Sequence, residues 1–411
     1  MEKQLIPKLR FPEFADEWKK TKLEEIVNVY DSLHQTPKSY SENGYPMIRV
    51  TDVNNGNLNL DKCLRVTESV FKEFTKKYKP KKNDIIISRV GTCGFTIILK
   101  TNDEVCLGQN TVLLQSKIDS VFLHSLIKTN TFQNQVNKKV VGSTQKTLSL
   151  KDLKKFNIKI PLSNKEQQKI ASFLSDVDDK ITKLTKKKDL LEQYKKGIMQ
   201  KIFNQELRFK DDNGNEFPKW EVKKLCDLGV TLNGLTGKTK ENFGSGKPYI
   251  QYKQIFDSSK INIEDCGFVE ITPSDNQTKM QYGDVFFTTS SETPNEIGTA
   301  SVLLDEAEEI YLNSFCFGFR VLQTVLYPSF SQFLFRSNNF RKKMIPLAQG
   351  STRYNISKSS FLKLKVFLPS IEEQTKIANF LSDIDIKIEA LNTKIENSKA
   401  FKKGLLQQMF V

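Results

Sequence analysis

The chain has 411 residues, of which 38% are hydrophobic and 27% are charged, a composition typical of a folded globular protein. Lysine and arginine number 63 against 48 aspartates and glutamates. The resulting net charge of +15 favours a polyanionic partner, with nucleic acid as the first candidate. No apolar run reaches the roughly 18 residues of a membrane span, and the first ten residues contain no apolar signal core, so we expect a cytoplasmic protein.

The residues that usually carry chemistry are sparse. The six cysteines include no CxxC pair, and the only histidines are His34 and His124, which argues against a zinc site, a redox motif or a histidine-based triad. Residues 236–239 end like a phosphate-binding loop, but Leu232 stands where its first glycine is required. We therefore expect no catalytic residue, metal or cofactor in this chain.

The first 163 residues predict an α/β (α+β) globular unit. Short β-rich runs alternate with turn residues, and two longer segments have plausible N-caps at Thr67 and Ser120. The expected strands are 84–88, 95–99, 110–114 and 156–160, and the expected helices are 67–78 and 120–138.

A long helix follows at 164–203, and then the whole order repeats. Residues 166–203 and 373–410 align without a gap and share 19 identities in 38 positions, where chance gives two or three. In the second unit we expect strands at 284–289, 299–304 and 364–368 and a helix at 329–344. The predicted organisation is a pseudo-two-fold repeat of four parts: 1–163, 164–203, 204–371 and 372–411.

Both long helices carry apolar residues in alternating steps of four and three, the pattern of a coiled-coil seam. Each seam needs a partner, and the repeat supplies a matched one, so we expect an antiparallel intramolecular coiled coil. A homodimer interface or docking onto another protein is the alternative. The expected pairing residues are Ile170, Leu174, Val177, Ile181, Leu184, Leu191 and Ile198 on the first helix, and Ile377, Leu381, Ile384, Ile388, Leu391, Ile395 and Leu405 on the second.

Three loop sets in each globular unit carry side chains of the types that can read base edges. One follows the strand that starts at Asp84 or Asp284, one surrounds a repeated Gly-Ser-Thr, and one lies near position 49 or its counterpart 251. Ordinary polar loops are the alternative for any single residue. The expected DNA-binding residues are Arg49, Ser88, Arg89, Thr92, Ser143, Thr144, Gln145 and Lys146 in the first unit, and Gln251, Tyr252, Lys253, Thr289, Ser290, Ser291, Ser351, Thr352, Arg353, Tyr354 and Asn355 in the second.

The two units differ in charge. Residues 1–163 contain 27 basic and 17 acidic residues, whereas residues 204–371 contain 20 and 19. We therefore expect the first unit to contribute more of the attraction to phosphates.

The repeated motifs resemble a known family. Glu166-Gln167-Gln168-Lys169-Ile170-Ala171 and Glu373-Gln374-Thr375-Lys376-Ile377-Ala378 are similar to the conserved region of the specificity subunits of type I restriction-modification systems. Lys8-Leu9-Arg10-Phe11 with Trp18, its echo 206–209 with Trp220, and the doubled Gly-Ser-Thr also resemble that family. The resemblance covers essentially the whole chain, and the doubled order of the motifs makes it specific.

The resemblance implies a non-catalytic DNA-recognition subunit. Each globular unit would be a target-recognition domain for one half of a bipartite DNA sequence, read in the major groove, and the paired helices would set the half-site spacing. Two modification subunits carrying S-adenosylmethionine would dock on this framework, and two restriction subunits would bring ATP, magnesium and the cutting activity. The alternatives are a nuclease or methyltransferase with an unrecognised active site, and a coiled-coil scaffold that binds only protein.

Overall fold

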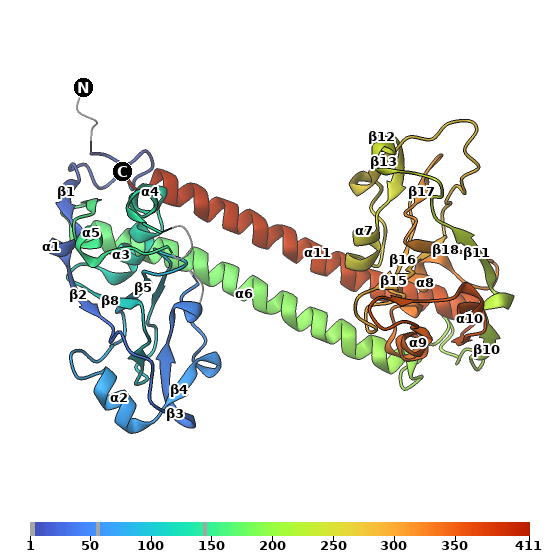
Figure 1. Cartoon of the computed structure of the whole chain (residues 1–411), viewed down its shortest axis with the longest axis horizontal. Helices are drawn as coiled ribbons and strands as arrows, with labels where there is room; N and C mark the ends of the chain where they lie inside the picture. Colours follow the sequence, from blue (N-terminus) through green and yellow to red (C-terminus); the bar gives the residue numbers. More distant parts are fainter. Residues whose placement is uncertain (1–4, 55–57, 143–145) are drawn as a thin grey trace. The chain divides into compact units, whose positions relative to one another are not determined.

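The computed structural model describes residues 5–54, 58–142 and 146–411, which form two compact units (Figure 1). The first unit comprises Met1–Thr185 and Thr393–Val411, and the second comprises Lys186–Asn392. Each long helix is therefore divided between the units, and each unit contains a segment of both helices.

The first unit is built on small, mostly antiparallel sheets. A four-stranded sheet has the order β2-β8-β5-β6, and a three-stranded sheet has the order β4-β3-β7, in which β3 and β7 run parallel. A third pair joins β1 to β9. The strands are β1 (Lys19–Lys22), β2 (Val27–Asp31), β3 (Tyr40–Ile48), β4 (Leu64–Val66), β5 (Ile85–Ser88), β6 (Thr96–Ile98), β7 (Cys106–Leu107), β8 (Thr111–Ser116) and β9 (Asn157–Ile160).

Helices complete the first unit. They pack on a core that includes Trp18, Phe122 and Phe132, all of which are almost fully buried. The helices are α1 (Leu23–Ile26), α2 (Glu68–Phe74), α3 (Ser120–Ile127), α4 (Asn130–Lys139), α5 (Leu150–Lys154) and the first part of α6 (Asn164–Phe203), with 3-10 turns at Val50–Asp52 and Leu60–Lys62.

The second unit repeats this plan strand for strand. Its sheets have the orders β11-β18-β14-β16, β13-β12-β17 and β10-β20, with an additional ribbon β15-β19. The strands are β10 (Glu221–Lys224), β11 (Gly229–Asn233), β12 (Phe243–Ile250), β13 (Gly267–Val269), β14 (Val285–Thr288), β15 (Ser290–Ser291), β16 (Ala300–Val302), β17 (Tyr311–Leu312), β18 (Cys316–Val321), β19 (Tyr354–Asn355) and β20 (Lys365–Leu368). The helices are α7 (Tyr252–Asp257), α8 (Pro328–Leu334), α9 (Asn338–Met344), α10 (Lys358–Leu362) and the first part of α11 (Ile371–Gln408).

The prediction of one continuous helix at 120–138 and another at 329–344 is wrong. In each unit two short helices meet there at a corner, α3 and α4 in the first and α8 and α9 in the second. The Thr129 hydroxyl accepts a hydrogen bond from the Phe132 backbone N–H and starts α4, and Ser337 does the same for Phe340 and α9. A side-chain cap competes with continuation of the preceding helix. The N-cap of α3 is Asp119 rather than the predicted Ser120.

Each long helix begins with a buried carboxylate that binds the start of its globular unit. Glu166 accepts two hydrogen bonds from the Arg10 guanidinium, both at 2.8 Å, and one from the Trp18 indole N–H at 3.1 Å. Glu373 receives the same set from Arg208, at 3.2 and 2.6 Å, and from Trp220 at 3.1 Å. Glu166 raises the pKa of Arg10 through these hydrogen bonds. The repeated Arg, Trp and Glu are therefore one structural unit, present twice.

The glutamine after each of these glutamates, Gln167 or Gln374, connects the long helix by hydrogen bonds to the backbone of two other segments. Gln167 donates to the Pro161 carbonyl and accepts from the Asp119 backbone N–H, at the N-terminus of α3. In the second unit, Gln374 donates to the Pro369 carbonyl and accepts from the Tyr327 backbone N–H. Because both amides are buried, these bonds satisfy polar groups that would otherwise be costly to bury.

The core of each unit is completed by the far end of the other long helix. In the first unit, Leu405, Met409 and Phe410 of the chain's C-terminus pack among the same residues as Trp18. In the second unit, Ile202 and Phe203 at the end of α6 are buried against the core. Neither core is closed by one contiguous stretch of sequence.

Among the described residues, no helix combines the length and the apolarity that crossing a membrane requires.

Replacing Glu166 with Ala should destabilise the first unit by about 3–5 kcal/mol, because the Arg10 guanidinium would remain buried without an acceptor. Glu13→Ala is the matched control, since the Glu13–Lys169 ion pair also joins the N-terminal segment to α6 but is exposed and should contribute under ~1 kcal/mol. Urea unfolding with hydrogen exchange on α6 compares the two variants, and equal losses would contradict the anchoring role of Glu166.

Candidate nucleic-acid interface

The strand that leads into the first set of predicted loops is fixed at its start by a buried aspartate. Asp84 accepts from the Lys81 backbone N–H at 2.8 Å and from the Tyr78 hydroxyl at 3.0 Å, and burial raises the pKa of its carboxyl group. In the second unit, Asp284 forms a two-pronged ion pair with Arg320 at 2.9 and 2.7 Å, which raises the pKa of the guanidinium. These aspartates hold the strand and leave the loop after it free to vary.

Two of the predicted loop sets meet through backbone hydrogen bonds in both units. In the first unit, Val90 forms a β-bridge with Thr147, and the Gly91 N–H donates to the Lys146 carbonyl at 2.9 Å. In the second unit, the ribbon β15-β19 pairs Ser290 with Asn355. Loops more than 50 residues apart are thus placed side by side on each frame.

In each unit the third loop set shares a cavity with the loop that follows the Asp84 or Asp284 strand. In the first unit a cavity of about 360 Å³ is lined by residues from these two neighbourhoods, among them Arg49, Thr51 and Gly91. In the second unit a cavity of about 390 Å³ lies among Tyr252, Ser291 and other residues of the same loops. The Tyr252 hydroxyl donates to the Ser290 carbonyl at 2.8 Å and ties α7 to the ribbon.

The predicted DNA-binding residues of the first unit differ in how far their side chains are exposed to solvent. Thr92 and Lys146 are exposed, whereas Ser88 is fully buried and its hydroxyl donates to the Thr92 carbonyl. Arg49 is half-exposed and binds Asp52 through its guanidinium. Ser143, Thr144 and Gln145 lie outside the described residues.

Arg89 is more constrained than the sequence indicated. Its side chain is only 15% exposed, its guanidinium lies 3.6 Å from the Asp31 carboxylate, and it contacts the His34 ring at 3.0 Å. Reading a base edge would require this arginine to exchange its present partners.

In the second unit most predicted residues are accessible. Gln251 and Lys253 are exposed, and Lys253 forms an ion pair with Asp257 along α7. Thr289, Ser290, Tyr252 and Tyr354 are half-buried, and Ser291 is buried. The remaining predicted residues are exposed: Ser351, Thr352, Arg353 and Asn355.

The sequence reasoning missed residues that line the same cavities. In the first unit they include Gln35, Gln109 and Asn110, and in the second Glu292 and Phe315. Asn110 and Phe315 occupy the same position, just before β8 and β18. A strand-by-strand alignment of the two units would have found this pair.

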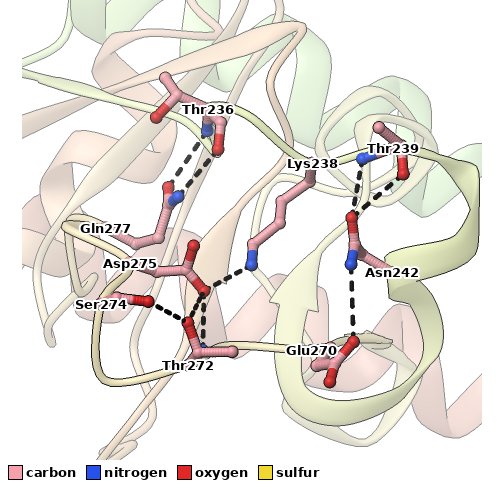
Figure 2. A network of polar contacts seen from close by, with 9 residues as sticks. All are labelled: Thr236, Lys238, Thr239, Asn242, Glu270, Thr272, Ser274, Asp275 and Gln277. Atoms are coloured by element: carbon pink, nitrogen blue, oxygen red, sulfur yellow. Dashed lines mark hydrogen bonds and ion pairs between the residues drawn. The ribbon is translucent and has the colours of Figure 1, made fainter.

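The segment that ends like a phosphate-binding loop is engaged within the second unit (Figure 2). The Lys238 ammonium is nearly buried and binds the Asp275 carboxylate at 2.6 Å. Gln277 exchanges two hydrogen bonds with the backbone of Thr236. The network fastens this loop to residues 270–277, so the lysine that a phosphate would need already neutralises a carboxylate.

Among the described residues, no three or more histidine, cysteine, aspartate or glutamate side chains are placed to hold a metal ion together. The two frames with their converging loops define a duplicated protein with two equivalent loop surfaces.

The chain belongs to the family of the type I restriction modification DNA specificity domain, whose profile matches residues 15–193 and again residues 218–398. It is 24% identical to a putative type I restriction enzyme MjaX specificity subunit of Methanocaldococcus jannaschii, over 97% of this chain and 94% of that one. It is 22% identical to the EcoKI specificity subunit of Escherichia coli, over 90% of this chain and 82% of that one.

Solved structures share the fold. The S subunit of a type I restriction-modification system from M. genitalium superposes with a TM-score of 0.60 at 16% identity, covering 99% of both chains. A chain from a structure of a type I R-M system, described for its complex assembly and conformational transition, gives 0.54 at 14% identity, covering 96% of this chain and 97% of that one. The repeat found in the sequence is therefore a pair of specificity domains.

The pKa of Asp275 is lowered to about 2, first by its hydrogen bond from Lys238 and then by those from Thr272. A depressed folded-state pKa means that the contribution to stability is present above the unfolded value near 3.8 and is lost as the pH falls toward 2. In Lys238→Met we expect the NMR titration midpoint of the Asp275 carboxyl to rise toward 3.8. An unchanged midpoint would mean that Lys238 does not hold this carboxylate charged.

Proposed function

We propose that this chain is the non-catalytic DNA-recognition subunit of a type I restriction-modification complex. Residues 1–163 and 204–371 each read one half of a bipartite target in the major groove. The observation that carries the proposal is the convergence of three loop sets on two copies of one frame, together with the different residues of the loop after Asp84 and the loop after Asp284. Unlike loops on a repeated frame suit two unlike half-sites.

Charge supports the same function unequally in the two units. The excess of ten basic residues in 1–163 supplies attraction to the phosphates, which carries no sequence information but positions the protein. Residues 204–371 are almost neutral, so this unit depends more on the geometry of its loop donors and acceptors.

The two long helices, 164–203 and 372–411, form an antiparallel intramolecular coiled coil that sets the half-site spacing. Supporting contacts occur inside each unit: Lys402 binds Asp178 in the first, and Lys195 binds Asp385 in the second. Asp178 and Asp385 are equivalent positions of the repeat, and so are Lys195 and Lys402, so the same ion pair forms in both units with the roles of the two helices exchanged. The predicted seam residues are buried or half-buried throughout, as expected of a packed seam.

The remaining exposed faces of the helices dock two modification subunits. Tyr194 is 51% exposed and Phe401 is 55% exposed, and the two occupy the same register of the repeat. Three residues on, a Cβ atom at Gly197 or Gly404 would meet no other described part of the chain within 4 Å, apart from the adjacent backbone of its own helix. A glycine inside a helix costs about 1 kcal/mol, and packing within the chain requires neither glycine. An exposed aromatic ring next to a glycine allows another chain to approach the helix backbone closely. Because this arrangement occurs once on each helix, it fits two copies of the modification subunit.

The partners supply the chemistry. Modification subunits bring S-adenosylmethionine and methyl transfer, and two restriction subunits bring the ATP- and magnesium-dependent cutting. The support is the family and the relatives, which are named as subunits of restriction enzymes.

Gly197→Leu combined with Gly404→Leu should weaken binding of the modification subunit at least tenfold, because the new side chains block the bare backbone. The free chain should be as stable as before or more stable, since leucine favours helix. Native mass spectrometry counts the bound subunits, and each single variant should lose one of two. Lys183→Leu on an exposed helix face is the control; full occupancy in the double glycine variant would refute this docking site.

The function itself is tested with random DNA duplexes and a salt series, using the chain alone and with its modification subunits. We expect affinity that falls steeply with salt, by a slope near −0.9 for each phosphate contacted. Methylome sequencing of cells carrying the system should then show one bipartite motif. Absence of salt-dependent binding would favour a protein-only scaffold, and nuclease or methyltransferase activity of the chain alone would favour an enzyme.

A further inference from the structure

The loop surface of the second unit, which the proposed function assigns to DNA, carries an acidic residue. Glu292 lines the 390 Å³ cavity and is exposed. Within the described part of the chain, no hydrogen bond or ion pair engages its carboxylate. Glu296, which lines the same cavity, differs because its carboxylate accepts from the Ser291 hydroxyl at 3.3 Å.

The DNA phosphates repel a nearby carboxylate, and a hydrogen bond to a base can compensate for this repulsion. The donor is an exocyclic amino group of the base: glutamate accepts a hydrogen bond from cytosine N4 in the major groove. Since residues 204–371 have almost no basic excess to offset the repulsion, an unpaired carboxylate on this loop surface needs such a partner.

The ribbon brings a cation close to this carboxylate. In β15-β19, Ser290 pairs with Asn355 and Ser291 pairs with Tyr354, and the register extended by one position beyond the ribbon brings Glu292 opposite Arg353. Arg353 is exposed and lines the same cavity. Directly opposed residues in an antiparallel pair lie about 5 Å apart, well within the reach of both side chains to one base pair.

One base pair matches this arrangement. A G·C pair presents the cytosine N4 amino donor beside the guanine O6 and N7 acceptors in the major groove. A glutamate and an arginine side by side offer an acceptor and a two-pronged donor in the same order. Phe315, 57% exposed, adds an apolar wall to the cavity.

The first unit has a different lining at the equivalent place. Its cavity is bordered by Gln35, Gln109, Asn110 and Arg49, and by no carboxylate among the described residues. The acid and base pair is therefore a property of the second unit and not of the repeated frame.

We propose that Glu292 and Arg353 together read one G·C base pair, with the Glu292 carboxylate on the cytosine amino group and the Arg353 guanidinium on the guanine. The inference rests on the proposed function and names the base pair that one half of the target must contain.

The test uses the chain co-expressed with its modification subunits and a plasmid library randomised at each position of the motif found for the parent chain. Glu292→Ala and Arg353→Lys should each relax the same single G·C position, by about 5- to 150-fold in methylation preference, which is the discrimination of one base contact. All other positions of both half-sites should keep their requirement. Glu308→Ala, at an exposed glutamate outside the cavity, should leave the whole motif unchanged.

The chemistry of the variants separates base reading from a phosphate contact. Lysine keeps the charge of Arg353 and would preserve a phosphate contact, but it loses the two-pronged geometry. Relaxation at two different base pairs, a uniform loss across the motif, an unchanged motif, or a parent half-site without a G·C pair would overturn the inference. Failure of the proposed function looks different, because the parent complex would then methylate no specific motif.

Discussion

The buried carboxylate at the start of each long helix is the interaction on which the two units depend. Glu166 and Glu373 each bind an arginine and a tryptophan that lie about 150 residues earlier in the chain. A buried charge of this kind is tolerable only when all its partners arrive together. The N-terminal segment, the core and the helix must therefore assemble as one, which explains why their motifs recur together in both halves of the sequence.

The closing of each core by the opposite helix adds a second constraint. Phe410 lies among residues near the N-terminus of the chain, and Phe203 completes the core of the second unit. Each frame is thereby packed against both helices, whereas the predicted loops lie largely outside these two cores. A rigid frame with variable loops allows new recognition without a new fold.

The sequence predicted the frame well because its signals are strong and local. Helical periodicity located α6 and α11 to within a few residues, and the central strands were expected within two residues of their observed ends. The corner between α3 and α4 was missed because Thr129 sits in an otherwise helical pattern, and only its hydrogen bond to the Phe132 backbone N–H shows that it starts a new helix.

What the sequence determined alone is the duplication, the two long helices and the family, since identities and periodicity do not depend on contacts. Only the tertiary structure decided which loop side chains are exposed to solvent and which are buried or bound to neighbouring residues. Ser88 turned out to be buried and Arg89 bound to its neighbours, whereas Glu292 and Arg353 face the same cavity through the register of a short ribbon. Such pairings join residues far apart in the chain, and no local pattern records the distance between them.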